Sequence, residues 1–345
     1  MNSSVTPEAY PCKTAVVILG WNGISLLQQF LPSVVLYSSL PDVTLVYVDN
    51  HSTDESVQWV RDNFPLVRII QLPHNLGFAG GYNEALREVK AQYYVLLNQD
   101  VEVTEHWLSP VVELLDNNLS VWAAQPKVLA WNDKTKFEYA GAAGGMLDWL
   151  GYPFCRGRLF HITESDEGQY NSSEPIFWAS GAVLFIRADT FHSLGGFDTS
   201  FFAHQEEIDL CWRIQKEGGI IMYVPKARVY HLGGGSLDME SPRKTFLNFR
   251  NNLLMLLHNL PIGQLIIVLF LRFFLDLLAA AVFLLKRQPA KTHAVVKAYL
   301  EFVRKIPAHC KKRTKAKKRV PLYPRSLLWE FYVKKRQRFT DWKQV

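Results

Sequence analysis

The first hundred or so residues alternate short apolar runs with stretches of helical spacing, and this alternation constrains the fold more than any other feature of the chain. The apolar runs cover 15–19, 43–48, 67–72 and 93–97, and the stretches with helical spacing cover 26–37, 52–64 and 79–90. Strands that alternate with helices in this way are typical of βαβ units, which build a parallel sheet covered by helices. The sequence therefore predicts an α/β fold.

The second half of the chain gives weaker signals. The segment 121–174 is rich in glycine and aromatic residues and predicts irregular structure. A strand is predicted at 179–187, a helix within 197–218, and two short strands at 220–224 and 228–231. The predicted helix carries three acids near its start: Glu206, Glu207 and Asp209.

Polar clusters follow each of the first four predicted strands. They are Gly20-Trp21-Asn22-Gly23, Asp49-Asn50-His51-Ser52-Thr53-Asp54, the group Asn75, Gly77, Gly80 and Gly81, and Asn98-Gln99-Asp100. In parallel sheets, ligands bind beyond the carboxyl ends of the strands. Four polar clusters at one edge predict a binding pocket there.

Three of these clusters carry groups suited to a nucleoside diphosphate. Asp49 can accept a hydrogen bond from a pyrimidine or a ribose, and Trp21 can stack on a base, although simple packing of Trp21 is nearly as good an interpretation. A helix cap is the alternative for Asp49, but Ser52 and Asp54 are better placed for capping. Asp100, with Asn98 beside it, offers the hard oxygen ligands that a divalent cation on a diphosphate requires.

The acids at the start of the predicted helix have two interpretations. One of them can serve as a general base, since crowding of like charges raises a carboxyl pKa toward the range that a base needs. The alternative is a favourable interaction with the helix dipole, worth about 0.3–1 kcal/mol for each acid.

In order along the chain, these segments resemble glycosyltransferase family 2, in particular its bacterial rhamnosyltransferase-like branch. The matching segments are 16–23, 48–54, 75–83 and 96–100, then Ser180-Gly181-Ala182, Gly195-Gly196-Phe197-Asp198, Phe201-Phe202, Glu206-Glu207-Ile208-Asp209-Leu210, Val224-Pro225 and Val229-Tyr230-His231. The resemblance extends from about Thr14 to Gly235, and its specificity comes from the ordered set of motifs.

The resemblance implies a GT-A fold, with a Rossmann-like mixed central sheet, and an inverting single displacement. It implies a UDP- or dTDP-sugar as donor, with rhamnose as the leading sugar. It places Asp49 and Trp21 at the base of the donor, with Gly77, Asn83 and Asn98 also in the donor-binding motifs. It implies Mg²⁺ or Mn²⁺ at Asp100, with His231 completing the metal site.

Two residues depart from the pattern of the family. The usual catalytic pair is Glu-Asp, whereas this chain has Glu206-Glu207, so we assign the base to Glu207 and keep Asp209 as the alternative. At the metal element Asn98 stands in place of an acid, which leaves Asp100 as the one carboxylate of that segment.

Charge is distributed unevenly along the chain. The net charge is +6, but residues 286–345 hold 19 Lys and Arg against 3 Asp and Glu, and the rest of the chain is net acidic. An acidic body with a basic tail argues against a nucleic-acid-binding protein and favours contact with a membrane surface; a solvated tail is the alternative.

The segment 262–285 is almost wholly apolar and long enough to cross a bilayer. It contains Arg272 and Asp276, and each charge at mid-bilayer would cost about 2.5–3.5 kcal/mol. An interfacial or re-entrant helix is therefore the favoured prediction, with a spanning helix second and a buried soluble helix third.

Four regions are expected: an N-terminal tail (1–13), a glycosyltransferase domain (14–240), a helical region (241–285) that includes the apolar segment, and a basic helical tail (286–345). The first residues lack the pattern of a secretory signal, and the four cysteines lie far apart with no zinc spacing, which fits a reducing compartment. We therefore expect a protein attached to the cytoplasmic face of the plasma membrane, acting on a lipid-linked or cell-envelope glycan.

Other functions predict different residues. A nucleotidyltransferase needs a basic, glycine-rich loop after the first strand, and Gly20-Trp21-Asn22-Gly23 has no basic residue. A catalytically weak adaptor with the same fold predicts loss of the pocket carboxylates, yet Asp49, Asp100, Glu207 and Asp209 are all present. A processive synthase needs several spanning helices and a Gln-x-x-Arg-Trp-type motif, and the sequence has neither.

Overall fold

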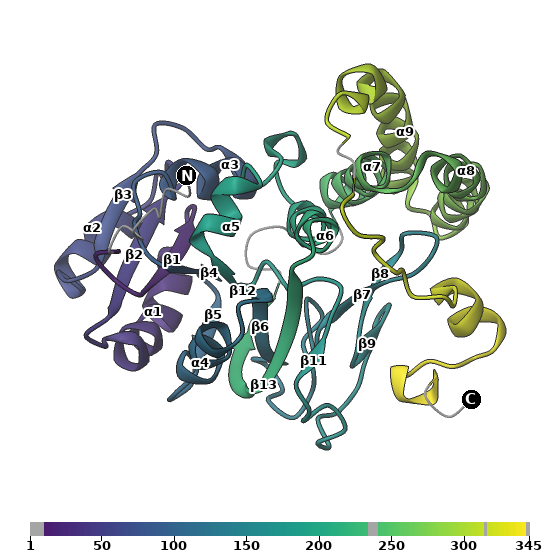
Figure 1. Ribbon diagram of the computed structural model, residues 1–345. Coiled ribbons are helices and arrows are strands. Elements are labelled where there is room, and N and C mark those ends of the chain that lie inside the picture. The colour runs from purple at the N-terminus through teal and green to yellow at the C-terminus, as the bar shows by residue number, and fades with distance from the viewer. Residues whose placement is uncertain (1–9, 234–240, 314–315, 343–345) are drawn as a thin grey trace, which may run out of the picture.

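The computed structural model describes residues 10–233, 241–313 and 316–342 (Figure 1). Most of the expected N-terminal tail and the expected domain boundary at 240 lie outside the described residues, as do Gly234 and Gly235 at the end of the resemblance. A nine-stranded mixed sheet forms the centre, in the order β11-β13-β6-β12-β4-β1-β2-β3, with β5 paired to β13.

The predicted elements of the first half are present. The strands are β1 (Thr14–Gly20), β2 (Val43–Asp49), β3 (Arg68–Gln71) and β4 (Tyr93–Asn98), and the helices are α1 (Ile24–Ser38), α2 (Ser56–Asn63) and α3 (Gly77–Ala85). β1 pairs in parallel with both β2 and β4, and β2 pairs in parallel with β3. β1 and β4, in the middle of the sheet, are mainly apolar because both of their faces are buried under helices.

Helices cover both faces of the sheet and define two apolar cores. One core contains Leu27, Leu31 and Val34 of α1 together with α4 (Ser109–Asn117). The other, larger core lies under α3, α5 (Ala188–Ser193) and α6 (Glu206–Glu217), and it continues into the C-terminal helices. Leu27, Leu31 and Val34 are spaced four and three residues apart, which is the helical spacing that predicted this helix from the sequence.

The prediction of irregular structure at 121–174 was wrong. β6 (Val121–Ala130) runs through the main sheet between β13 (Ile220–His231) and β12 (Val183–Arg187). The strand is not recognisable in the sequence because its centre is Gln125-Pro126-Lys127. In the structure Gln125 and Lys127 are buried, and Lys127 Nζ lies 2.6 Å from Asp166 Oδ2.

The rest of the segment also contains strands. β7 (Gly145–Leu147), β8 (Pro153–Cys155), β9 (Arg158–Leu159) and β10 (Ile162–Thr163) form a small antiparallel sheet, and β5 (Val101–Val103) and β11 (Glu174–Pro175) join the main sheet. The two strands predicted at 220–224 and 228–231 are one strand, β13, with an irregularity between Val224 and Arg228.

Three C-terminal helices gather on the side of the molecule away from α1 and α2 (Figure 1). They are α7 (Pro242–Asn259), α8 (Ile262–Leu285) and α9 (Pro289–Cys310). The expected basic helical tail is helical only in part, because residues 316–342 form extended segments with short turns at Trp329–Val333 and Phe339–Trp342.

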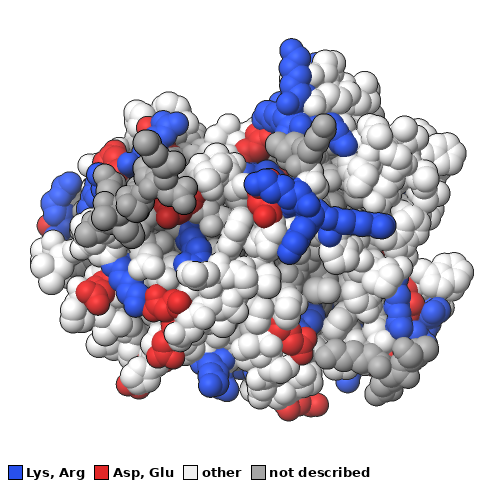
Figure 2. All heavy atoms as spheres, viewed as in Figure 1, with Lys and Arg blue, Asp and Glu red and all other residues white. Residues whose placement is uncertain are grey.

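In the described part of the chain, α8 is the helix that is long and apolar enough to cross a membrane. Its two charges point inward: Arg272 is 2% exposed and Asp276 1%. The two side chains form an ion pair at 3.3 Å, and Asp276 also accepts hydrogen bonds from Tyr152 and Tyr299. The opposite face of α8 exposes apolar side chains, which Figure 2 shows as a surface almost without charge.

Asp276→Ala should destabilise the protein by about 3–5 kcal/mol, because it leaves the buried Arg272 without its anionic partner. The free energy of unfolding is measured by urea titration in mild detergent. Phe270→Ala on the same helix, at a side chain that is 64% exposed, is the matched control and should change it by less than about 0.5 kcal/mol. Equal, small effects of the two substitutions would contradict the inward placement of the pair.

Candidate active site

The carboxyl ends of β1, β2 and β4 lie side by side at one edge of the sheet. Gly20 is opposite Asp49 across the β1–β2 ladder, and Leu19 is opposite Asn98 across the β1–β4 ladder. Three of the four predicted polar clusters begin at these strand ends, so the parallel register brings them together. The fourth joins them because Asn50 Nδ2 donates to the Gly77 carbonyl at 3.0 Å and Asn50 Oδ1 accepts from Leu76 N at 2.9 Å.

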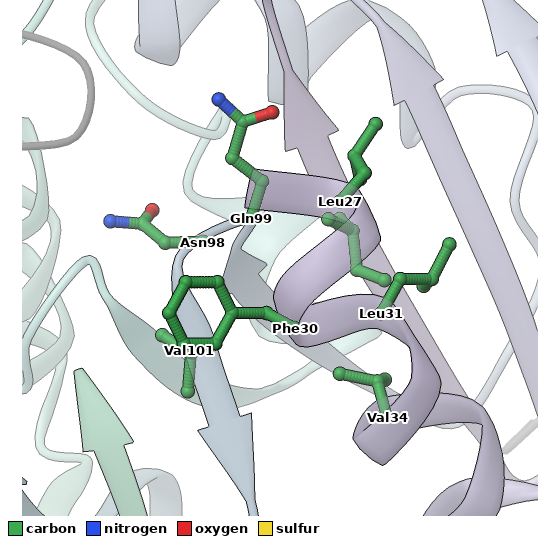
Figure 3. A pocket seen from close by; sticks show the side chains of 8 residues that line it. Leu27, Phe30, Leu31, Val34, Asn98, Gln99 and Val101 are labelled. Atoms are coloured by element: carbon green, nitrogen blue, oxygen red, sulfur yellow. The ribbon is translucent and has the colours of Figure 1, made fainter. Parts of the chain in front are cut away.

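Glycine at two positions of the loop after β1 leaves room for the Gln99 side chain. A Cβ on Gly23 would lie 2.2 Å from Gln99 Oε1, and one on Gly20 would lie 2.6 Å from the same atom. The Gln99 side chain thus lies directly beneath this loop. The crevice behind it, lined by α1 side chains such as Leu27 and Phe30, is too narrow to hold a nucleotide (Figure 3).

Hydrogen bonds fasten the loops after β1 and β2 to each other. Ser52 Oγ accepts from Asn22 N at 2.9 Å, and Asn22 Oδ1 accepts from Thr53 N at 2.7 Å. Asp54 accepts hydrogen bonds from the first amide of α1 and from Ser56 N at the start of α2. Asp54, and not Asp49, therefore caps these helices. Asp49 is buried and accepts from Ser52 N at 3.1 Å, while the Trp21 ring is 46% exposed at the mouth of this edge.

Asp100 meets His231 because β5 reverses direction after Asp100 and pairs antiparallel with the end of β13, with Val101 opposite His231. Both side chains are buried, and Asp100 Oδ1 lies 3.1 Å from His231 Nε2. On the other side of the ring, Glu138 Oε2 lies 3.4 Å from Nδ1. Burial alone would lower the pKa of His231, but Asp100 and Glu138 outweigh it and raise the pKa to about 10.

These donors suit a divalent cation. Two neighbouring ligands of an octahedral ion, each at about 2.1 Å, lie about 3 Å apart, which matches the separation of the Asp100 oxygen and the His231 nitrogen. Because imidazole binds a metal in its neutral form, binding would release the proton that His231 shares with the two carboxylates. The oxygen and nitrogen donor set therefore fits the metal that the sequence predicted at these two residues.

The two glutamates at the start of α6 lie in a dry environment. Glu206 is buried and Glu207 half-buried, and one carboxylate oxygen of each has no hydrogen-bond partner among the residues that the structure describes. Burial raises the pKa of Glu207 to about 7. Burial and the neighbouring Glu207 raise the pKa of Glu206 well above its usual value. Near neutral pH, the pair thus holds one protonated acid beside a carboxyl group in the titration range of a general base.

Asp209, the alternative base, is fully engaged elsewhere. It forms an ion pair with Arg213 at 2.8 Å, accepts from Asn259 Nδ2 at 2.7 Å, and lies 3.6 Å from His258 Nδ1. Burial alone would raise the pKa of Asp209, but Arg213 and His258 outweigh it and hold the pKa far below the usual range. A carboxylate with so low a pKa is a weak base, so the geometry favours Glu207.

Comparison with known proteins identifies the family. The family model described as glycosyl transferase family 2 matches residues 15–161, and the one described as glycosyl transferase family group 2 matches residues 95–285, more than half of the chain. The chain belongs to glycosyltransferase family 2. It is thus a glycosyltransferase.

Individual relatives agree with this assignment. An N-acetylglucosaminyl-diphospho-decaprenol L-rhamnosyltransferase of Mycobacterium tuberculosis is 29% identical over 227 residues, which are 59% of this chain and 71% of that protein. The crystal structure of S. aureus TarS 1–349 is similar with a TM-score of 0.54 at 15% identity, over 87% of this chain and 83% of that one. The structure of GalNAc-T7 with UDP, GalNAc and Mn²⁺ has a TM-score of 0.52 at 19% identity, over 64% and 43% of the two chains. The fold of the glycosyltransferase is GT-A.

The structure also shows the surroundings of the other three residues that the resemblance placed in the donor-binding motifs of the glycosyltransferase. Gly77 adopts φ +70° where a Cβ would meet Phe202 at 2.6 Å, so its role is to permit that approach. Asn83 binds the backbone of Phe197 with both its amide nitrogen and its oxygen, which favours a structural role over contact with the donor. Asn98 remains half-buried at the end of β4 beside Gln99 (Figure 3).

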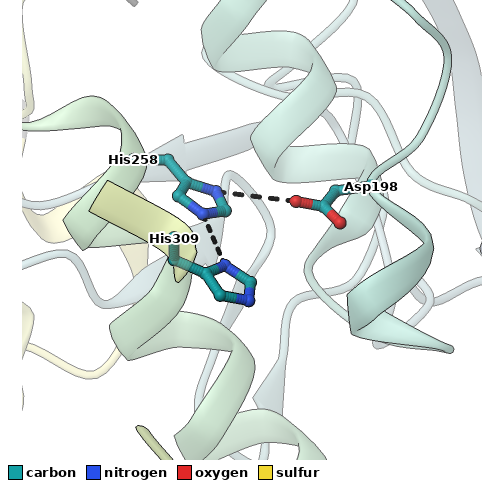
Figure 4. A group of neighbouring side chains, drawn as sticks. All are labelled: Asp198, His258 and His309. Atoms are coloured by element: carbon teal, nitrogen blue, oxygen red, sulfur yellow. Dashed lines mark hydrogen bonds and ion pairs between the residues drawn. The ribbon is translucent and has the colours of Figure 1, made fainter. Parts of the chain in front are cut away.

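A second group of metal-binding residue types lies where η1 (Thr199–Phe201) meets α7 and α9. Asp198, His258 and His309 lie within reach of one another (Figure 4). However, Lys312 Nζ donates to both oxygens of Asp198 at 2.8 Å, and the two imidazole rings stack and hydrogen-bond directly at 2.8 Å. Because the two histidines bind each other and Lys312 binds Asp198, we interpret the group as a junction between elements rather than a metal centre.

Sequence reasoning missed the residues that act on the site from other elements. Glu138, beside His231, lies in the segment whose strands were not predicted, and no motif marks it. Asn259 and His258 of α7 hold Asp209, and no pattern in the sequence connects an amphipathic helix with an acid fifty residues earlier.

The two candidate bases should differ in their effect on stability. Asp209→Asn should lower the free energy of unfolding by about 1.5–3 kcal/mol, because it weakens charge-assisted bonds to Arg213 and Asn259. Glu207→Gln should leave it unchanged or raise it at pH 8, since burial disfavours the charged form of Glu207. Chemical denaturation at pH 8 measures both. The opposite order would mean that Glu207, not Asp209, is the structural acid.

Proposed function

We propose that this glycosyltransferase transfers a sugar, with rhamnose the first candidate, from UDP or dTDP to a hydroxyl of a lipid-linked or cell-envelope glycan, with inversion at the anomeric carbon. The observation that carries the proposal is the pairing of Asp100 with His231 at the sheet edge that also holds Asp49, in a chain whose proposed base Glu207 has a pKa near 7. The lipid-linked acceptor and the sugar are suggested by the name of the mycobacterial relative.

At the donor side, Asp49 would accept from the base or ribose and Trp21 would stack against the base. Asp100 and His231 would hold Mg²⁺ or Mn²⁺, which neutralises charge on the leaving diphosphate. GalNAc-T7, a structural neighbour, was crystallised with UDP and Mn²⁺, in keeping with a nucleotide donor and a divalent metal.

At the acceptor side, Glu207 would take the proton from the attacking hydroxyl as the new C–O bond forms opposite the departing diphosphate. Its raised pKa makes it a stronger base than an exposed glutamate, while Glu206, whose pKa is higher, stays protonated. Keeping Glu206 protonated avoids two adjacent negative charges at the start of α6.

We also propose that α8 holds the protein on the cytoplasmic face of a membrane without spanning it. The exposed face of α8 presents a row of large apolar side chains: Ile262, Ile266, Ile267, Phe270, Phe273, Phe274, Leu277, Leu278, Val282, Leu284 and Leu285. Since Arg272 and Asp276 are buried against the protein on the other face, the helix suits insertion of one face into a leaflet. The Lys and Arg residues of the C-terminal region suit an anionic bilayer.

The function is tested by incubating the purified protein with a panel of UDP- and dTDP-sugars, a lipid-linked acceptor extract and Mg²⁺ or Mn²⁺, and measuring release of UDP or dTDP. Glu207→Gln should lower turnover by about 10²–10⁴-fold. Turnover of the natural protein should rise with pH through about 7, because the base acts only after Glu207 loses its proton. Asp100→Ala should weaken Mn²⁺ binding in the presence of UDP. Full turnover in both variants would show that the site is assigned wrongly.

Flotation with lipid vesicles tests the membrane proposal. The protein should float with vesicles that contain phosphatidylglycerol, more weakly at high salt and with uncharged phosphatidylcholine alone. Replacing Phe270 and Phe274 by Ser should abolish flotation, whereas Leu66→Ser, at a side chain that is 97% exposed near β3, should leave it unchanged. Equal flotation of the two variants would rule out α8 as the attachment surface.

A further inference from the structure

The segment just before the proposed base has an unusual backbone. Phe202, His204 and Gln205 all have positive φ angles, at 66°, 70° and 75°, and Gln205 is the residue that precedes α6. Non-glycine residues in the left-handed region cost about 1–3 kcal/mol each in strained settings and persist only where the surroundings hold them. Something outside the segment must therefore hold residues 200–205 in place.

Every carbonyl from residue 200 to residue 204 accepts a hydrogen bond from another element. Arg250 Nη2 donates to the Ser200 and Phe201 carbonyls at 3.1 and 3.2 Å. Asn251 Nδ2 lies 2.9, 2.9 and 2.8 Å from the carbonyl oxygens of Phe201, Ala203 and His204. The remaining carbonyl, that of Phe202, accepts from Phe78 N and Ala79 N in the first turn of α3.

Asn251 is itself held rigidly. Its side chain is 0% exposed, and its Oδ1 accepts from Arg250 Nε at 2.9 Å and Nη2 at 2.7 Å, which fixes the amide with its donors toward the loop. Arg250 is anchored in turn by an ion pair with Glu301 of α9 at 3.0 Å.

Asn252 continues the same contact. Its Nδ2 lies 3.3 Å from Gln205 Oε1 and 2.8 Å from the Gly151 carbonyl, and its Oδ1 accepts from Arg272 of α8 at 2.5 Å. Three consecutive residues of α7 therefore bind the strained segment. Arg250 and Asn252 are each supported by a second element, and Asn251 is supported by Arg250.

We propose that Arg250, Asn251 and Asn252 are positioning residues for the base: they hold residues 200–205 in the conformation that places Glu207 against the acceptor. This inference rests on the proposed function. The amide of Asn251 carries the largest share, because its Nδ2 lies within hydrogen-bond distance of three carbonyl oxygens of the segment. A shift of Glu207 by about 1 Å is enough to lower turnover by about 10²-fold. The helical region thus completes the active site as well as presenting the apolar face.

Asn251→Asp in the full-length protein tests the proposal, because it keeps the size of the side chain and removes its donors. Turnover should fall at least tenfold with the donor KM unchanged, and affinity for UDP with Mn²⁺ should also be unchanged, since the proposed donor contacts lie at the ends of β1, β2, β4 and β13. Hydrogen–deuterium exchange of peptides covering 200–210 should rise, with no change in peptides from β1 and β4.

Thr292→Val is the matched control. It removes a side-chain donor to the Ala280 carbonyl between α9 and α8, and it should change neither turnover nor exchange in the 200–210 segment. Should Asn251→Asp not fold, Arg250→Lys removes the donation to Ser200 and Phe201 while keeping a positive charge near Glu301. It should show the same pattern of lower turnover, unchanged donor KM and faster exchange.

Normal turnover and normal exchange in a folded Asn251→Asp or Arg250→Lys variant would overturn the proposal, as would an equal loss of turnover in Thr292→Val. Exchange is measured without substrate. A natural protein that transfers no sugar would therefore refute the proposed function, and faster exchange in the variant would still show that α7 holds the segment.

Discussion

The site depends on the parallel register of β1 with β2 and β4. That register sets Gly20 opposite Asp49 and Leu19 opposite Asn98, so polar segments that are far apart in the sequence start from one line at the edge of the sheet. β13 runs in the same direction through its parallel pairing with β6, so His231 reaches the same edge. Four strand ends thus supply the proposed donor side, and their relative positions are fixed by backbone ladders rather than by flexible loops.

The sequence predicts this half of the molecule well because its period and its polar clusters are local signals. Continuous apolar runs closed by Gly20, Asp49 and Asp100 are what a buried parallel sheet requires, and the observed strands end within a few residues of these positions. β6 was missed for the opposite reason. Gln125 and Lys127 look like surface residues in the sequence, but they are buried in the fold because Ser180 and Gly141 pair with Gln125, and Asp166 and Asn171 pair with Lys127.

The choice between Glu207 and Asp209 shows the same limit. In the sequence they are equivalent acids on one helical turn, and only tertiary partners separate them. Arg213 and His258 lower the pKa of Asp209, and Asn259 donates a hydrogen bond to it, whereas burial is the largest influence on the pKa of Glu207 and raises it. The sequence also could not predict that Arg272 and Asp276 point inward. It showed that the pair would be costly in a bilayer, but it did not show that two tyrosines bind Asp276.

Two opposing influences set the pKa of Glu207, the proposed base. Glu207 lies in the first turn of α6, where backbone amides lower its pKa, yet burial raises the pKa further and wins. Its strength as a base thus depends on exclusion of water from the start of α6. The segment 200–205 forms that start, and in our proposal Asn251 and Arg250 keep it closed. If α7 released the segment, water would reach Glu207, its pKa would fall toward that of an exposed glutamate, and the acceptor hydroxyl would face a weaker base as well as a displaced one.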